Sequence, residues 1–189
     1  FPVTGLIAID TETTGLHAWL GDRPFAVSMC NDLGETWYCD WEVNPQTREV
    51  YPEKSDVDFI RSVMENEGVT KVFHNGKFDI RMLELGIDVH LRGGLEETYF
   101  AARACDSSEP KYTLKYLADK YLGIDVSEMD MLLDCTRQCR TRAKHLQYTL
   151  AKQAYADYWM PKHFYPESEA SYYCEIYAVQ DVIRTMGLW

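Results

Sequence analysis

Short runs of apolar residues, bounded by turn-forming residues, predict that the chain begins with β-strands. Residues 6–9 form an apolar run that leads directly into a stretch with two carboxylates, Asp10 and Glu12. Residues 25–31 and 36–42 have the composition of two strands, and the Asn-Asp-Leu-Gly turn between them indicates a hairpin. Three strands are therefore expected before the first helix.

Apolar residues at helical spacing predict that most of the remaining chain is helical. A further short, buried strand is expected at residues 70–74. Helices are expected at residues 56–67, 76–86, 96–104, 113–122, 141–159 and about 169–186.

The last of these helices has the clearest pattern. Apolar residues recur along it at intervals of four and three: Tyr172, Ile176, Val179, Ile183 and Met186. We expect this stripe to face the core. Tyr177 and Asp181 are four residues apart, so they share a face, roughly 100° around the helix from Ile176. Both are therefore expected at the margin between the core and a cleft.

Length and composition favour one folded domain. The chain has 189 residues, and its 46% of hydrophobic residues is enough to form a substantial core and to exclude disorder. We expect a single domain over residues 1–189, with a helical insertion at about 124–168. The apolar runs are too short to span a bilayer, and no signal-peptide pattern is present, so no membrane partner is expected.

Cysteine usage indicates a reducing environment. Six cysteines are spread through a chain that is large enough to need no disulfides, which favours an intracellular, cytoplasmic location. Cys135 and Cys139 are four residues apart and are followed by His145 and His163, so a zinc site is an alternative to consider. Their spacing fits none of the common structural zinc patterns, which argues against it.

The net charge of −11 argues against general electrostatic binding of nucleic acid. The segment 137–162 is an exception, with six Lys or Arg residues and one acidic residue. A solvated helix face is the more common explanation of such a run. Alternatively, the segment approaches a phosphate backbone, with four aromatic residues as stacking surfaces: Tyr148, Tyr155, Tyr158 and Trp159.

The two carboxylates at the end of the first strand are candidate metal ligands. Because side chains alternate along a strand, Asp10 and Glu12 point to the same face. Two carboxylates held this close repel each other unless a cation neutralises them. The alternative is an ordinary polar loop after a strand. A metal site requires other carboxylates to converge on this pair.

Three short motifs supply such carboxylates in a familiar order. D-x-E with a Thr-Gly-Leu tail stands at residues 10–16, N-x-x-x-D at 75–79 and Y-x-x-x-D at 177–181. Together they resemble the 3′-5′ exonucleases with four metal-binding acids and a tyrosine. The resemblance is strongest to the proofreading domain of family A, polymerase I-like DNA polymerases of bacteria or phages. Residues 112–118 are similar to the family's S-L-K-x-L-A helix, whereas Glu97 stands where members often carry Asp.

The resemblance implies both a fold and an activity. The fold is α/β, a ribonuclease H-like three-layer arrangement with a mixed sheet of about five strands, the first three antiparallel. The activity is that of a 3′-5′ exodeoxyribonuclease that hydrolyses phosphodiester bonds at the 3′ end of single-stranded or frayed DNA and releases nucleoside 5′-monophosphates. Two divalent ions, Mg²⁺ or Mn²⁺, would be its cofactors. Its partner would be a DNA polymerase domain, in the same chain or separate.

The resemblance also implies roles for individual residues. Asp10, Glu12 and Asp181 would hold the first metal, and Asp10 would bridge to a second metal served by Asp79. Tyr177 would orient the attacking water, since a phenol with a pKa of about 10 is a poor base at neutral pH. Four residues would contact the substrate: Leu16 as a wedge against the terminal base, Asn75 and Phe78 as walls of the 3′-nucleotide pocket, and Thr11 through its backbone N–H.

Two other hypotheses stay open. Exonucleases that trim RNA, of the ribonuclease D or Werner type, share the four acids and the tyrosine. The helix at 113–122 and the closing Tyr-Ala-Val-Gln-Asp segment favour the polymerase group. A catalytically inactive nucleic-acid-binding module is the alternative from another functional class, and it is disfavoured because none of the four acids is missing.

Overall fold

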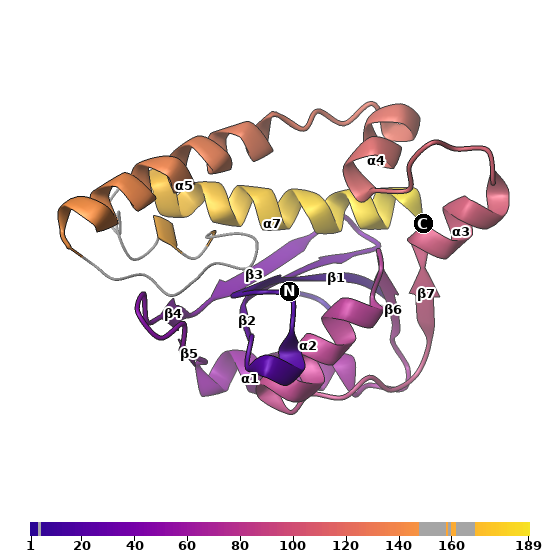
Figure 1. The fold of residues 1–189 in the computed structure, drawn as a ribbon. Helices are drawn as coiled ribbons and strands as arrows, with labels where there is room; N and C mark the ends of the chain where they lie inside the picture. The colour runs from indigo at the N-terminus through magenta and orange to yellow at the C-terminus, as the bar shows by residue number, and fades with distance from the viewer. Residues whose placement is uncertain (4, 148–157, 159, 162–168) are drawn as a thin grey trace.

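The computed structural model describes residues 1–3, 5–147, 158, 160–161 and 169–189 (Figure 1). Several predictions fall outside this part of the chain. They concern most of the expected helix at 141–159, the candidate zinc ligand His163, and three of the proposed stacking aromatics, Tyr148, Tyr155 and Trp159.

The described chain is built on a five-stranded mixed sheet with strand order β3-β2-β1-β6-β7. The first three strands are β1 (Leu6–Thr13), β2 (Pro24–Asn31) and β3 (Thr36–Asp40), and they pair antiparallel. The other two, β6 (Thr70–Phe73) and β7 (Leu95–Glu97), extend the sheet in parallel with β1. The predicted mixed sheet of about five strands is confirmed. A separate small ribbon contains β4 (Glu42–Val43) and β5 (Val50–Tyr51).

Strand β1 continues past the end of its parallel neighbour. Its pairing with β6 ends where Ala8 faces Val72, whereas its pairing with β2 continues to the end of β1. Asp10 and Glu12 therefore lie beyond the end of β6, where the chain turns into helix α2 (Lys77–Ile87). This edge of the sheet is the place where several elements converge.

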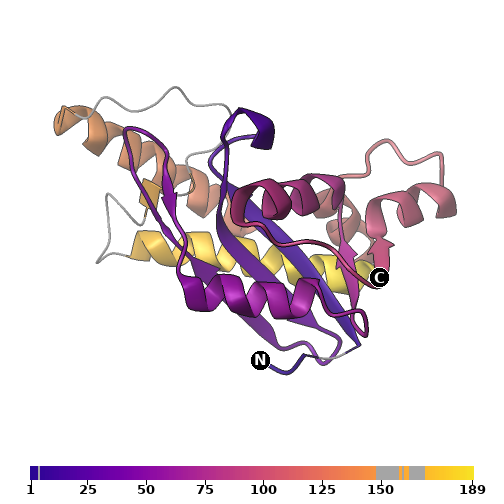
Figure 2. The same cartoon turned by 90° about the horizontal axis from the view of Figure 1, so that it is seen from below.

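Helices cover both faces of the sheet (Figures 1 and 2). On one face lie α1 (Lys54–Met64) and α2. On the other, α7 (Glu169–Leu188) crosses the first three strands, and α4 (Leu114–Leu122) and α5 (Ser127–His145) pack against it. Helix α3 (Thr98–Cys105) follows β7, and the single turn η1 (Ala18–Leu20) packs against α2. The predicted three-layer arrangement is confirmed.

Side chains alternate along β1, so the strand contributes to a separate apolar core on each face of the sheet. Ile7 and Ile9 pack with residues of α1 and α2, including Ile60 and Leu83. On the opposite face Ala8 packs against Val182 of α7. Asp10 and Glu12 share the face of Ala8, so the strand directs them toward α7.

The predicted core face of α7 is wrong. Tyr172 is 57% exposed, and the other members of the predicted stripe are only partly buried. The buried apolar positions are instead Cys174, Ala178 and Val182. The Ser28 hydroxyl donates a hydrogen bond to the Ala178 carbonyl at 3.0 Å, so the helix backbone lies close to the sheet. Only small side chains fit in that contact, and the larger ones pack along its flanks.

Two helix boundaries also differ from the prediction. Residues 96–97 belong to β7, and the helix begins at Thr98, because Glu96 and Glu97 pair with β6 across the sheet. Helix α5 starts at Ser127 and ends at His145, so the described part of the helix expected at 141–159 is the last turn of α5. Among the helices that the structure describes, none has the length and apolarity needed to cross a membrane.

Candidate active site

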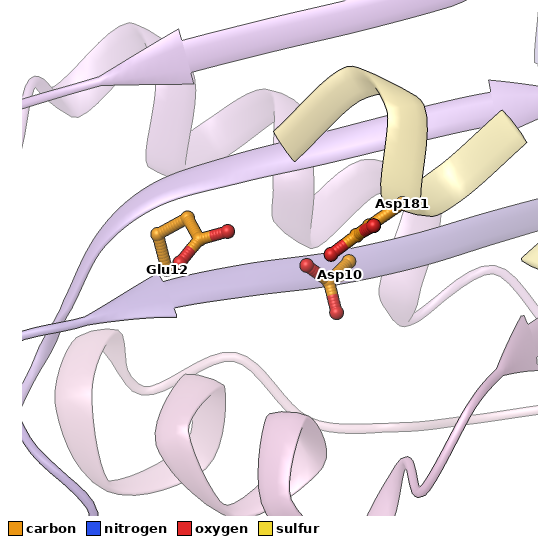
Figure 3. A group of neighbouring side chains, drawn as sticks. All are labelled: Asp10, Glu12 and Asp181. Carbon is orange, nitrogen blue, oxygen red and sulfur yellow. The ribbon is translucent and has the colours of Figure 1, made fainter. Parts of the chain in front are cut away.

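Three carboxylates meet at the edge where β1 passes the end of β6. Asp10 and Glu12 come from β1, and Asp181 comes from the buried side of α7. One oxygen from each lies within 4.8 Å of the others. Figure 3 shows the carboxylates of Asp10 and Asp181 turned toward each other, with Glu12 nearer the end of the strand. The three acids predicted to hold the first metal are thus brought together.

Burial and mutual repulsion disfavour the ionised forms of these carboxylates. Burial raises the pKa of Asp10 well above its ordinary value, and the negative charges of Asp79, Glu12 and Asp181 raise it further. Burial and the charge of Asp181 raise the pKa of Glu12 to about 8. Hard oxygen donors at this separation suit a divalent cation such as Mg²⁺ or Mn²⁺, which would favour the ionised carboxylates.

Asp79 reaches the same strand from the first turn of α2. Its Oδ1 accepts hydrogen bonds from the Thr11 hydroxyl at 2.6 Å and the Thr11 backbone N–H at 3.1 Å. The side chain is 4% exposed, and burial raises its pKa to about 7 despite these hydrogen bonds. Asp79 is outside the 4.8 Å group, although its charge acts on Asp10. The Thr11 N–H predicted to face the substrate is here bound to Asp79.

A strained turn sets the direction of α2. Asn75 has a left-handed backbone, with φ of 69°, and a Cβ on Gly76 would overlap the Phe73 side chain. The Gly76 N–H donates to the Glu97 carboxylate at 3.0 Å. Glu97, whose role the sequence leaves open, therefore supports the turn that carries Asp79.

Two cations hold Asp181 in place. Lys115 Nζ, from α4, lies 2.8 and 2.7 Å from the two Asp181 oxygens and 4.0 Å from the centre of the Tyr177 ring. Arg184 is completely buried, and its Nη1 donates to Asp181 at 2.9 Å and to Glu128 of α5 at 2.7 Å. No sequence pattern predicted a role for either cation. The spacing of three between Asp181 and Arg184 is a detectable signal, whereas the contact of Lys115 depends on how α4 packs against α7.

Tyr177 is half-buried one turn before Asp181. Its ring lies 5.1 Å from that of Tyr158, measured between centres. Burial raises its pKa, and the charges of Glu12 and Asp181 act in the same direction. Tyr177 is therefore a neutral phenol that can donate a hydrogen bond but is poorly suited to act as a base.

Three of the four predicted substrate residues gather around one hollow. Leu16, Asn75 and Phe78 line one hollow of about 310 Å³. Thr11 is not among its described lining residues and instead binds Asp79.

The zinc alternative gains no support from the described residues. Cys135 and Cys139 have their sulfurs 4.0 Å apart, buried in an apolar cluster with Leu132 and Phe25. In the described part of the chain, the three acids are the one group of three or more potential metal ligands whose donor atoms lie within 4.8 Å of one another.

Comparison with known proteins agrees with the geometry. Residues 3–189 match a protein family described as 3′-5′ exonuclease, of the DNA polymerase A type. DNA polymerase DpoZ of Salmonella phage PMBT28 is 35% identical over 117 residues, which are 61% of this chain and 17% of the polymerase. The chain therefore spans less than a fifth of the curated relative that it matches.

Solved structures show the same fold at low sequence identity. Brucella melitensis NrnC superposes with a TM-score of 0.62 and 20% identity, covering 98% of this chain and 70% of NrnC. Escherichia coli RNase D, described as an exoribonuclease involved in structured RNA processing, gives a TM-score of 0.54 and 18% identity, covering 97% and 37%. These neighbours have the ribonuclease H-like exonuclease fold, which confirms the predicted fold class. The chain belongs to the 3′-5′ exonuclease family of the DNA polymerase A type.

Proposed function

We propose that this chain removes nucleotides from the 3′ end of single-stranded or frayed DNA, releasing nucleoside 5′-monophosphates, and that it proofreads for a DNA polymerase. The observation that carries the proposal is the convergence of Asp10, Glu12 and Asp181 in a member of a 3′-5′ exonuclease family. The similarity to a phage DNA polymerase favours DNA as the substrate and a polymerase domain, in the same chain or separate, as the partner.

The four acids have the chemistry to hold two divalent cations. In this proposal Asp10, Glu12 and Asp181 bind one ion, and Asp10 with Asp79 serves the other. The close oxygen donors and the raised pKa values of Asp10 and Glu12 fit such a site. One of the NrnC structures was solved with bound Mg²⁺. Bound ions would lower the pKa of the attacking water and neutralise charge that develops on the phosphate.

The chain's own side chains would position the reactants. Tyr177, as a neutral phenol, donates a hydrogen bond to the attacking water and orients it. Leu16 packs against the terminal base, and Asn75 and Phe78 form the walls around the 3′ nucleotide. Asp79 anchors the start of α2, and with it these walls, to β1 through Thr11.

The direct test is hydrolysis of a 5′-labelled single-stranded oligonucleotide with Mg²⁺ or Mn²⁺. We expect a ladder of products shortened from the 3′ end, with loss of activity in chelator and in Asp10→Asn and Asp181→Asn. Asp32→Asn, an exposed acid in the hairpin turn, is the matched control and should retain full activity. Equal residual activity in the parent and both site variants would instead support an inactive binding module.

RNA is the alternative substrate. RNase D shares the fold, and one NrnC structure was solved bound to pGG. Matched single-stranded DNA and RNA of the same sequence separate the two hypotheses. We expect faster shortening of DNA, and a clear preference for RNA would overturn the proposed substrate.

A further inference from the structure

Arg184 is a buried cation beside the acids that has no part in the proposed reaction. It lies one turn after Asp181 on α7 and is completely buried. Its Nη1 donates to Asp181 Oδ1 at 2.9 Å and to Glu128 Oε1 at 2.7 Å, and its Nη2 donates to the Asp125 backbone carbonyl. A buried charge is costly unless its partners are well placed. Here three partners, from two parts of the chain, hold one guanidinium.

Glu128 and Asp125 hold Arg184 from the beginning of α5. Glu128 is in the first turn of that helix and is 6% exposed, and Asp125 precedes the helix. A carboxylate in the first turn is also stabilised by the helix dipole. Because α5 packs against α7, these contacts restrain the guanidinium independently of Asp181. The start of α5 is thereby joined to a candidate metal ligand through one side chain.

The two cations at Asp181 contact its oxygens differently. Lys115 Nζ lies within hydrogen-bond distance of both oxygens, whereas the contact of Arg184 is with Oδ1. The Lys115 side chain is 20% exposed and reaches the site from a separate helix. A metal that displaces Lys115 from Oδ2 can therefore bind there while Arg184 keeps its hydrogen bond to Oδ1.

Asp181 reaches the acid group from a different element than the other two acids. Asp10 and Glu12 are placed by one strand, whereas Asp181 depends on the position of α7 and on its own side-chain torsions (Figure 3). Hydrogen bonds from surrounding groups fix the orientation of metal ligands, and their loss typically weakens metal binding about ten- to hundredfold. Arg184 is placed to supply such a bond.

We propose that Arg184 is a positioning residue of the metal site. Its bond to Oδ1 sets the rotation of the Asp181 carboxylate and leaves Oδ2 to a divalent cation, while Glu128 holds the guanidinium in place. This role rests on the proposed function, because it takes Asp181 as a metal ligand. The positive charge of Arg184 repels a cation, so its contribution to metal binding comes from geometry.

The test measures Mn²⁺ binding to the metal-free chain, from the electron paramagnetic resonance signal of the free ion. Arg184→Met should weaken Mn²⁺ binding at least about tenfold. Charge alone predicts the opposite, because the variant removes a charge that repels the ion. Arg184→Lys keeps the charge but not the planar fork that bonds two elements, so it should also bind Mn²⁺ more weakly than the parent.

A double variant separates positioning from stability. Arg184→Met leaves Glu128 buried without this counter-charge, so the metal-free variant should melt at a lower temperature than the parent. Arg184→Met/Glu128→Met removes both charges and should recover most of this loss in melting temperature, followed by circular dichroism. Its Mn²⁺ affinity should stay as low as that of Arg184→Met, since nothing restores the bond to Asp181.

Arg48→Met/Asp22→Asn is the matched control, because it removes a largely buried ion pair outside the acid group. It should change Mn²⁺ affinity by less than about twofold. The role of Arg184 is overturned if Mn²⁺ affinity recovers together with stability in the double variant, or if Arg184→Met binds Mn²⁺ at least as tightly as the parent. Absence of Mn²⁺ binding by the parent overturns the metal site, and this role with it. The expected Mn²⁺ affinities without hydrolysis of the oligonucleotide overturn the proposed function and leave the role of Arg184 standing.

Discussion

Glu12 and Asp79 are carboxyl groups that the fold holds at raised pKa values, about 8 and about 7, in both cases chiefly through burial. Each binds its proton more tightly in the folded chain than in the unfolded chain. Their contribution to stability is therefore complete below the ordinary carboxyl pKa and is lost as the pH rises through about 7 to 8. We expect the metal-free protein to melt at a lower temperature at pH 8 than at pH 5.5, and Mg²⁺ to restore stability mainly at pH 8. Thermal unfolding in chelator and in excess Mg²⁺ measures both effects.

Glu12→Gln isolates the contribution of one of these groups. The variant cannot ionise at that position, so its melting temperature should depend less on pH, and Mg²⁺ should shift it less. Glu42→Gln, an exposed glutamate on β4, is the matched control and should follow the parent. If the melting temperature of Glu12→Gln depended on pH as strongly as that of the parent, the raised pKa of Glu12 would not explain the loss of stability.

Lys115 is the cation that any metal at Asp181 must compete with. It bonds both Asp181 oxygens, and its charge lowers the pKa of Asp10 and Glu12 against the stronger effect of burial. Lys115→Met should destabilise the metal-free protein by about 1–3 kcal/mol, because it leaves three carboxylates without this counter-charge. It should also enlarge the stabilisation by Mn²⁺, measured by unfolding with and without the ion.

Lys120→Met provides the comparison on the same helix. Lys120 pairs with Glu109 and not with the acids of the site, so its loss should leave the shift caused by Mn²⁺ unchanged. Equal shifts in the parent and Lys115→Met would show that Lys115 does not compete with the metal.

The loop between β1 and β2 depends on Gly15. A Cβ at this position would overlap the Asp22 carboxylate, which Arg48 and the His17 N–H hold in place. Gly15→Ala should therefore displace the loop that carries Leu16 and weaken the binding of single-stranded DNA several-fold, measured by fluorescence anisotropy in chelator, with little loss of overall stability. Because the clash requires Asp22, Gly15→Ala should add little to Asp22→Ala. Additive losses in affinity for single-stranded DNA would contradict this mechanism.

The sequence predicted those features of the site that depend on neighbouring residues in one segment, and it missed those that depend on packing between distant segments. Alternation along β1 was enough to place Asp10 and Glu12 on one face, and the resemblance of the three motifs to the exonuclease family added Asp79 and Asp181. The burial of α7 was mispredicted, because the close contact at Ala178 favours small side chains over the most apolar ones. The contact of Lys115 with Asp181 arises from packing between helices that are far apart in the sequence, and no local pattern encodes it.

The net charge of the chain determines how the isolated protein should respond to salt. With a charge of −11, the isolated chain should bind single-stranded DNA weakly, and an attached or partner polymerase should deliver the 3′ end. Each phosphate contact on a single strand adds about −0.7 to the slope of log affinity against log salt concentration, so a few contacts predict a shallow slope. If the six basic residues of segment 137–162 also touched the backbone, the slope would be several units steeper. A salt titration of single-stranded oligonucleotide binding in chelator distinguishes these cases. A tight complex that is insensitive to salt would contradict both.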